Sequence, residues 1–234
     1  MQHLVLCSDY DGTLAHHGEL LDRTTRALER LRASGRRVVL VTGRELDDLQ
    51  SVCRRLDLFD YVVAENGALL YRPSTGEEHP LADRPPDRFV EMLRARGIDR
   101  VSTGRVIVAT WEPFETIVLE TIRDLGLELQ VIFNKGAVMV LPSGVSKATG
   151  LAIALERLQI PPERAVGIGD AENDHALLAF CGCAVAVSNA LQSLKDEADV
   201  VTRGDHGDGV IEIIESLLAR DACAPGASAA ASAL

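Results

Sequence analysis

The fold is decided by the stretch His3-Leu4-Val5-Leu6-Cys7-Ser8-Asp9-Tyr10-Asp11-Gly12-Thr13, in which a short apolar run meets two closely spaced carboxylates. We predict a strand over 3–8. If the backbone stays extended, residues two apart point to the same side, so Asp9 and Asp11 share one pocket and Tyr10 turns away. Gly12 permits a sharp turn after the strand. Adjacent carboxylates repel each other unless a cation or a proton intervenes, and a hard cation such as Mg²⁺ prefers oxygen ligands. The alternative interpretation is a polar strand end with a solvated pair of aspartates.

Further apolar runs alternate with amphipathic helical patterns along the chain. The predicted strands are 37–41, 61–64, 165–169, 184–187 and 199–202. The predicted helices are 22–34, 45–56, 147–158, 173–180, 189–196 and 208–219. Continuous apolar strands are typical of a sheet buried on both faces, and regular alternation with helices favours a doubly wound, Rossmann-like α/β fold with a parallel sheet.

The alternation changes between residues 68 and 144. There we predict strands at 68–73, 105–111, 127–133 and 137–141 and helices at 86–96 and 113–125. The last two strands, joined by Asn134-Lys135-Gly136, favour an antiparallel hairpin. We interpret this part as a small inserted α+β cap domain. The predicted domains are a core of residues 1–72 and 144–220, a cap of 73–143 with Pro73–Gly76 and Pro142–Gly144 at its junctions, and a disordered Ala- and Ser-rich tail of 221–234. One continuous domain with long excursions is the alternative.

The composition limits the functional classes. The chain has 234 residues and a formal charge of −11, which argues against nucleic acid as a partner. No apolar run approaches the roughly 18 residues that span a bilayer, and the first residues do not resemble a signal peptide. We therefore expect no membrane association and a cytoplasmic location. The five cysteines show no C-x-x-C pair, and we expect them to be thiols.

Other polar groups also follow predicted strands or begin predicted helices. Thr42-Gly43-Arg44 follows the strand at 37–41, Asp170 follows the strand at 165–169, and Lys147 begins the helix at 147–158. Ligands of open α/β sheets bind beyond the carboxyl ends of the strands, so these groups are expected to converge. Thr42, Gly43 and Lys147 suit a phosphate, and Asp170 and Asp174 can add metal ligation. Taken singly, each of these motifs is more typical of a turn, a solvated helix residue or a helix cap.

Together, Asp9–Thr13, Thr42–Arg44, Lys147 and Gly169–Asp174 resemble the four motifs of the haloacid dehalogenase superfamily, in the right order. The insertion and Glu65-Asn66-Gly67-Ala68 are similar to its Cof-type and sucrose-phosphatase-like branch with a type IIB cap. The short cap resembles the archaeal-type phosphoglycolate phosphatases.

The resemblance implies a hydrolase that acts on phosphoric monoesters through an aspartyl-phosphate. Asp9 would be the nucleophile and Asp11 the general acid and base. The predicted metal site for Mg²⁺ draws on Asp9, Asp11 through its backbone carbonyl, Asp170 and Asp174, although Asp174 is better suited to orienting bound water or Lys147. Thr42, Gly43, Lys147 and Asn173 are the predicted phosphate-binding residues.

The substrate is expected to be a small phosphoester, either a sugar phosphate or a phosphoglycolate-like compound. Its predicted contacts outside the motifs are Asn66, Arg72, Trp111 and Asn134, with Arg84, Arg88 and Lys135 as further candidates. A sugar phosphomutase and a non-catalytic protein that binds a phosphorylated metabolite are the alternatives. The chain is expected to be a monomer or a homodimer.

Overall fold

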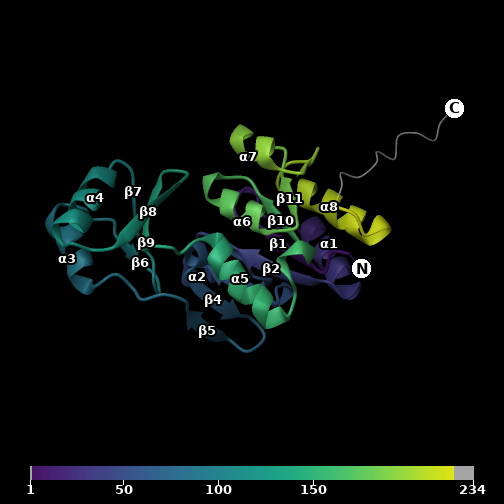
Figure 1. Ribbon diagram of the computed structural model, residues 1–234, viewed down its shortest axis with the longest axis horizontal. Coiled ribbons are helices and arrows are strands. Elements are labelled where there is room, and N and C mark those ends of the chain that lie inside the picture. Colours follow the sequence, from purple (N-terminus) through teal and green to yellow (C-terminus); the bar gives the residue numbers. More distant parts are fainter. Residues whose placement is uncertain (1, 224–234) are drawn as a thin grey trace.

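Two β-sheets organise the chain, of which the computed structural model describes residues 2–223 (Figure 1). The larger sheet has the strand order β12-β11-β10-β1-β2-β3-β4-β5, and the smaller has the order β6-β7-β9-β8. The strands of the larger sheet are β1 (Val5–Ser8), β2 (Arg37–Val41), β3 (Tyr61–Ala64), β4 (Leu69–Arg72), β5 (Glu77–Pro80), β10 (Ala165–Gly169), β11 (Cys183–Ala186) and β12 (Val200–Val201). Those of the smaller sheet are β6 (Ser102–Thr103), β7 (Val108–Trp111), β8 (Leu129–Asn134) and β9 (Ala137–Pro142).

The first six strands in the order of the larger sheet are parallel, and β4 pairs antiparallel with β3 on one side and with β5 on the other. From β1 the chain adds β2 and β3 on one side, and later β10, β11 and β12 on the other. The strand order therefore reverses between β1 and β10. This arrangement confirms the predicted doubly wound α/β fold, and it places a ligand-binding crevice at the carboxyl ends of these two strands.

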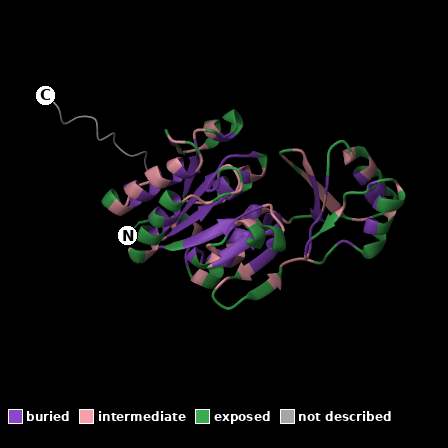
Figure 2. Ribbon diagram, turned by 180° about the vertical axis from the view of Figure 1, so that it is seen from behind, coloured by how far each residue is buried: buried purple, intermediate pink, exposed green. Residues whose placement is uncertain are grey.

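The apolar runs form these strands because both faces of the sheet are covered. All residues of β1, β3, β10 and β11 are buried, and β2 exposes only Arg37 at its first position. Figure 2 shows this buried centre as a continuous band through the larger sheet. Burial on two faces explains why these strands lack the alternation of polar and apolar residues that half-exposed strands show.

Helices cover the two faces of the larger sheet in pairs. The α-helices of the described residues are α1 (Asp22–Ala33), α2 (Leu46–Val52), α3 (Asp87–Ala95), α4 (Glu115–Asp124), α5 (Lys147–Leu158), α6 (His175–Phe180), α7 (Gln192–Glu197) and α8 (His206–Arg220). Of these, α3 and α4 belong to the smaller sheet. Helix α1 packs along α8, and α5 packs along α6. Right-handed crossovers that run in opposite directions from β1 place α1 and α6 on opposite faces. Within residues 2–223, no helix combines the length and the apolar character that a bilayer crossing needs.

The smaller sheet is antiparallel and is covered by α3 and α4, as Figure 1 shows at the end remote from α8. The two helices pack on each other and on the sheet through a separate hydrophobic cluster that includes Phe89, Leu93, Val118 and Val140. The predicted hairpin of β8 and β9 is confirmed. We infer that this unit is the inserted domain, and its boundaries at 73 and 143 stay a prediction.

The strand predicted at 68–73, where the alternation changes, lies in the larger sheet. It is β4 of the larger sheet, paired with β3 and followed by β5 in the same sheet. Pro73–Gly76 is therefore a hairpin turn and not a linker, because Pro and Gly are common to both. Strand β5, Glu77-Glu78-His79-Pro80, lacks an apolar pattern, and for this reason the sequence did not indicate it.

The structure differs from the expectations at Asp221 and at two of the cysteines. Asp221, predicted to begin a disordered tail, pairs with Arg36 at 2.7 Å, and the rest of the tail from 224 lies outside the described residues. The sulfur atoms of Cys183 and Cys223 are bonded to each other, whereas Cys7, Cys53 and Cys181 are thiols. Forty positions separate the two bonded cysteines, so their pairing depends on the path of α8 and has no local signal.

A turn after β3 joins the two sheets. This turn is the 3-10 helix η2 (Glu65–Gly67), and all three of its residues have positive φ. The Glu65 carboxylate is buried and accepts hydrogen bonds at 2.7–2.9 Å from the backbone N–H groups of 105, 106 and 107, which lead into β7. A buried carboxylate that accepts three N–H groups fixes the start of the smaller sheet against the larger one.

The same turn leads to a prediction about Gly67. Its φ is +105°, and an added Cβ would lie 1.9 Å from the carbonyl oxygen of Ser146. We expect Gly67→Ala to lower the free energy of unfolding by roughly 2–5 kcal/mol, because backbone strain and overpacking add. Urea denaturation measures the change.

The matched control is Gly76→Ala, because Gly76 also has a positive φ, +73°, but has nothing within 4 Å of an added Cβ. This variant should lose only the strain, about 1–2 kcal/mol. Equal losses in the two variants would contradict the importance of the close approach at Ser146.

Candidate active site

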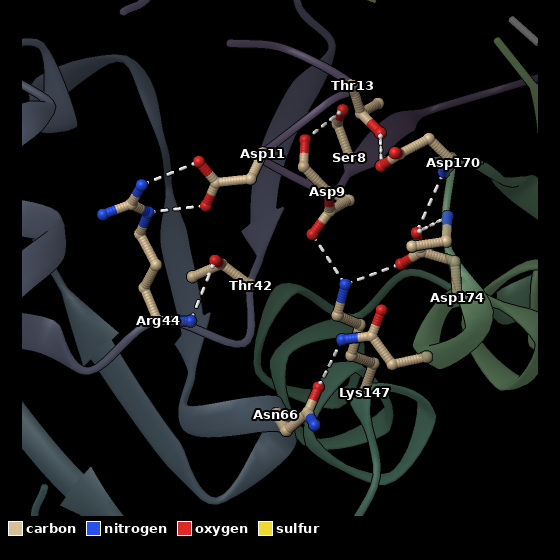
Figure 3. A network of polar contacts seen from close by, with 12 residues as sticks. Ser8, Asp9, Asp11, Thr13, Thr42, Arg44, Asn66, Lys147, Asp170 and Asp174 are labelled. Carbon is tan, nitrogen blue, oxygen red and sulfur yellow. Dashed lines mark hydrogen bonds and ion pairs between the residues drawn. The ribbon is translucent and has the colours of Figure 1, made fainter. Parts of the chain in front are cut away.

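The predicted polar groups converge at one edge of the larger sheet. Asp9, Thr42 and Asp170 directly follow β1, β2 and β10, and Lys147 is the first residue of α5. Parallel strands bring their carboxyl ends to the same edge, and β1 and β10 are neighbours where the strand order reverses. Segments of the chain that are more than 100 residues apart in sequence therefore form one site (Figure 3).

The centre of the site is a buried ammonium group. The side chain of Lys147 is 1% exposed, and its Nζ donates to Asp9 Oδ1 and to Asp174 Oδ1, both at 2.6 Å. Figure 3 shows Lys147 rising from α5 between the two carboxylates. A capping box of Ser146 and Thr149 fixes the start of the helix, so the base of the lysine is held by backbone geometry.

Asp174 uses both of its carboxylate oxygens to hold other parts of the site. Its Oδ1 accepts from Lys147, and its Oδ2 accepts from the backbone N–H groups of Asp170 and Ala171 at 2.9 and 3.0 Å. Asp174 thus shapes the turn that presents Asp170 and orients the lysine. These contacts favour the orienting role for Asp174 over direct metal ligation.

Burial and charge shift the pKa values of this cluster. Desolvation raises the pKa of Asp9 to about 8, with Asp174 and Asp170 adding to the rise and Lys147 opposing it. Burial by itself lowers the pKa of Lys147, but Asp174 and Asp9 outweigh it and raise that pKa above its ordinary value. Carboxylates thus outnumber cations in the buried centre, and such a site favours an added cation.

Asp11 lies beside Asp9 in sequence but points to a different partner. Both of its carboxylate oxygens accept from Arg44, at 2.5 and 2.8 Å, and Arg44 also donates to Asp48. Figure 3 shows Asp11 turned away from Asp9 toward the arginine. The two-point pair with Arg44 holds the Asp11 side chain in this orientation.

The oxygen atoms around Asp170 fit a hard cation. One carboxylate oxygen from each of Asp9, Asp170 and Asp174 lies within 4.8 Å of the others. The backbone oxygen of Asp11 and Asp170 Oδ2 already hold a cation, since the Lys135 ammonium donates to them at 2.7 and 2.9 Å. Carbonyl and carboxylate oxygens are the ligands that Mg²⁺ prefers. We infer that Asp9, Asp170 and the carbonyl of Asp11 are the groups that would hold it.

A pocket of about 570 Å³ opens above these groups, between the two sheets. The larger sheet contributes Asp9, Asp11 and Thr42–Arg44 to its wall, and the smaller sheet contributes Trp111, Asn134, Lys135 and Met139 among others. Trp111 is 54% exposed, so its ring is available to a ligand. The volume suits a small metabolite.

Some of the residues predicted to contact the substrate lie outside this pocket. Arg72 is outside this pocket and stacks over the ring of Tyr61. The reason is the direction of β4: it runs antiparallel to β3, so its last residue reaches the opposite edge of the sheet. Arg84 pairs with Asp87, and neither Arg84 nor Arg88 lines the pocket.

The buried Asn66 and the partly buried Asn173 form a hydrogen-bonded pair next to the loop at Gly43. Asn173 Nδ2 donates to Asn66 Oδ1 at 2.9 Å, and an added Cβ at Gly43 would lie 3.5 Å from Asn173 Nδ2. Both side chains therefore support the loop at Gly43 from below.

Two residues near the site were missed by the prediction. Thr13 Oγ1 donates to Asp170 Oδ1 at 3.0 Å, and Arg44 holds Asp11. Both residues belong to the motifs quoted in the sequence analysis. Their position next to predicted site residues could have indicated a role in the site. Lys135 was predicted only as a substrate contact, because nothing in the sequence places a hairpin of the insertion against Asp170.

Comparisons with known proteins match most of the chain. A family model described as haloacid dehalogenase-like hydrolase matches residues 6–110 and 106–214. A phosphoglycolate phosphatase of Pyrobaculum aerophilum is 33% identical over 226 residues, which cover 94% of this chain and 98% of that protein.

Solved structures share the fold at lower identity. A Thermoplasma acidophilum protein superposes with a TM-score of 0.80 at 16% identity, over 92% of this chain and 98% of that one. A sugar phosphatase of subclass IIB of the same superfamily superposes with a TM-score of 0.70 at 19% identity, again over 92% and 98%.

The buried lysine leads to a prediction about stability. Lys147→Met removes the cation shared by Asp9 and Asp174 and leaves their charges uncompensated. We expect the metal-free variant to lose about 3–5 kcal/mol of unfolding free energy, as is typical when one partner of a buried ion pair is removed. Urea denaturation in the presence of a chelator measures it.

The matched control is Lys195→Met on α7, at a partly exposed position, which should change the unfolding free energy by less than about 0.5 kcal/mol. If Lys147→Met were as stable as this control, Lys147 would not be the group that compensates the carboxylates.

Proposed function

The chain belongs to the haloacid dehalogenase-like hydrolases, and from this membership and the geometry of the site we propose that it is a Mg²⁺-dependent phosphatase that hydrolyses a small phosphomonoester through an aspartyl-phosphate. Under this proposal Asp9 is the nucleophile and Asp11 is the general acid and base. The proposed ligands are Mg²⁺ and a small phosphoester. Nucleic acid is not a proposed partner. A cytoplasmic location and a monomeric or homodimeric state stay predictions.

One observation supports the proposal most strongly: the meeting of Asp9, Asp170 and Lys147 within hydrogen-bonding or ligation distance at the switch point of the sheet. A carboxylate nucleophile needs a cation beside it, because its own charge and that of the phosphate repel each other. The site has one fixed cation in Lys147 and a group of oxygen atoms suited to a second.

In the first step, an Asp9 oxygen forms a bond to phosphorus as the ester oxygen leaves. Asp9 Oδ1 is held by Lys147, which fixes the orientation of the carboxylate toward the pocket. The leaving oxygen takes a proton from Asp11, so the alcohol departs neutral. Mg²⁺, when bound, would offset the negative charge that the phosphate and the carboxylates share.

In the second step, a water molecule attacks phosphorus and loses its proton to Asp11. The bond between phosphorus and the Asp9 oxygen breaks, and inorganic phosphate and the free carboxylate remain. Asp11 accepts two hydrogen bonds from Arg44 in the present arrangement. Both steps therefore require Asp11 to leave Arg44 and turn toward the pocket when substrate binds.

The remaining phosphate oxygens have donors nearby. Thr42 Oγ1 accepts from the backbone N–H of Arg44 at 3.2 Å, so the hydroxyl hydrogen of Thr42 can point to a phosphate oxygen. The Lys147 ammonium has three donors, of which Asp9 and Asp174 take two. Its third hydrogen and the N–H of Gly43 complete the proposed cradle.

We propose a substrate of the size and charge of phosphoglycolate. The pocket of about 570 Å³ is closed on the side of the smaller sheet by Trp111, Asn134 and Lys135. An ammonium at that side suits a second anionic group. The relative of 33% identity is named a phosphoglycolate phosphatase, and this supports the choice. A sugar phosphate is the second substrate class.

The proposed activity is tested by a panel of phosphoglycolate, sugar phosphates and nucleotides, with inorganic phosphate as the readout. We expect release from phosphoglycolate with Mg²⁺ and loss of that release with a chelator. A sugar phosphomutase would return phosphate to its substrate and need a bisphosphorylated activator. A protein that bound these compounds and released no phosphate under any of the conditions would be the non-catalytic alternative.

The nucleophile has its own prediction. Asp9→Asn should lower kcat by at least about 10³-fold, since loss of a nucleophile removes the covalent path. Circular dichroism should show an unchanged fold. The control is Asp83→Asn at an exposed position outside the pocket, which should retain wild-type kcat. An active Asp9→Asn enzyme would refute the assignment.

A further inference from the structure

The Lys135 ammonium is hydrogen-bonded to two of the oxygen atoms that we inferred above to be metal ligands. It lies in the tight turn between β8 and β9 of the smaller sheet, where its own φ is +49°. Its Nζ donates to the backbone oxygen of Asp11 at 2.7 Å and to Asp170 Oδ2 at 2.9 Å. The chain has only three lysines, Lys135, Lys147 and Lys195, and two of them meet in this site.

We propose, on the basis of the function proposed above, that the Lys135 ammonium and the divalent cation exchange at these two oxygens, so that metal binding releases the β8–β9 turn from the larger sheet. Lys135 is then a positioning residue: it keeps the metal-free site closed. Three features of the site support the exchange: the shared oxygens, the charge balance and the different burial of the two lysines.

The two cations exclude each other at short range. Mg²⁺ binds oxygen at about 2.1 Å, whereas the ammonium nitrogen lies 2.7 and 2.9 Å from the same two atoms. Two positive charges that share a pair of ligands would lie within about 4 Å of each other and repel. The backbone at Gly12 packs closely against both groups, because an added Cβ there would lie 2.3 Å from Asp170 Oδ2 and 2.7 Å from Lys135 Nζ.

The charge balance favours the exchange. The cluster of Asp9, Asp170 and Asp174 with Lys147 and Lys135 carries three formal negative and two positive charges, a sum of −1. Replacing the outer ammonium by a divalent cation brings the formal charge of the cluster to zero. The released ammonium still lines the pocket, where it faces an anionic substrate.

The burial of the two lysines shows which one can leave. Lys147 is 1% exposed and is fixed at the start of α5, whereas Lys135 is 49% exposed and reaches the site from a turn of the other sheet. Withdrawing Lys135 rehydrates its ammonium at once, and withdrawing Lys147 would leave charges buried. The metal therefore displaces the outer cation and retains the inner one.

Amine acetylation followed by mass spectrometry tests the exchange on the wild-type protein. We expect Mg²⁺ to raise the acetylation rate of Lys135 several-fold, because its ammonium is released to solvent. Lys195 is the internal control and should react equally with and without Mg²⁺, and Lys147 should stay protected. An unchanged or lowered rate at Lys135, under conditions where calorimetry shows Mg²⁺ bound, would overturn the exchange.

Metal affinity gives an independent readout without substrate. By titration calorimetry, Lys135→Met should bind Mg²⁺ about tenfold more tightly than wild type, because no ammonium has to be displaced. Lys195→Met should bind it with wild-type affinity. Equal or weaker binding by Lys135→Met would refute the competition.

Phosphate release by the wild-type protein separates the two proposals. An active phosphatase whose Mg²⁺ affinity is unaffected by Lys135→Met would refute the exchange alone. A protein that shows the exchange but releases no phosphate would refute the phosphatase alone. A protein that binds no Mg²⁺ at all would refute both.

Discussion

The buried ammonium of Lys147 is the interaction on which the rest of the site depends. It joins the end of β1, the start of α5 and the turn after β10 through Asp9 and Asp174. A charge without solvent is tolerated only when opposite charges and hydrogen bonds surround it. The lysine needs both carboxylates, and in return it keeps them oriented toward one pocket. Stability and the proposed chemistry thus place the same demand on these three side chains.

The backbone meets this demand by close packing at two points. An added Cβ at Gly169 would lie 2.5 Å from the Cβ of Asp174, and one at Gly150 would lie 2.7 Å from the Cα of Gly67. The first approach lets the turn after β10 fold back so that Asp174 reaches Lys147. The second seats α5 against the turn after β3, and so fixes the position from which the lysine rises. The switch point of the sheet supplies the crevice, and these glycines allow its walls to come close enough for ion pairs of 2.6 Å.

Much of this arrangement could be predicted because it follows from local patterns and one topological rule. Strands buried on both faces show as apolar runs, and the polar residues that end them must meet at one edge of a parallel sheet; this rule was enough to bring Asp9, Thr42 and Asp170 together.

The rule fails where a strand reverses: β4 runs back along β3, and Arg72 consequently lies at the far edge. Strand β5 is exposed and charged, and the bond between Cys183 and Cys223 spans 40 positions, so neither has a local signal. The contact of Lys135 with Asp170 depends on how two sheets are placed relative to each other, which the turn at Glu65 decides through three backbone hydrogen bonds.

The two lysines of the site divide the task of charge compensation between a permanent and an exchangeable cation. A site with Lys147 alone would leave three carboxylates with one positive charge, and metal-free protein would then have to bear the repulsion. A second fully buried lysine would remove that repulsion but would also keep the metal out. A half-exposed lysine on the turn of another sheet avoids both costs, because it stabilises the metal-free state and withdraws into water when a stronger cation arrives. It also links the metal to the pocket, since the same side chain that leaves Asp170 lies on the wall that faces the substrate.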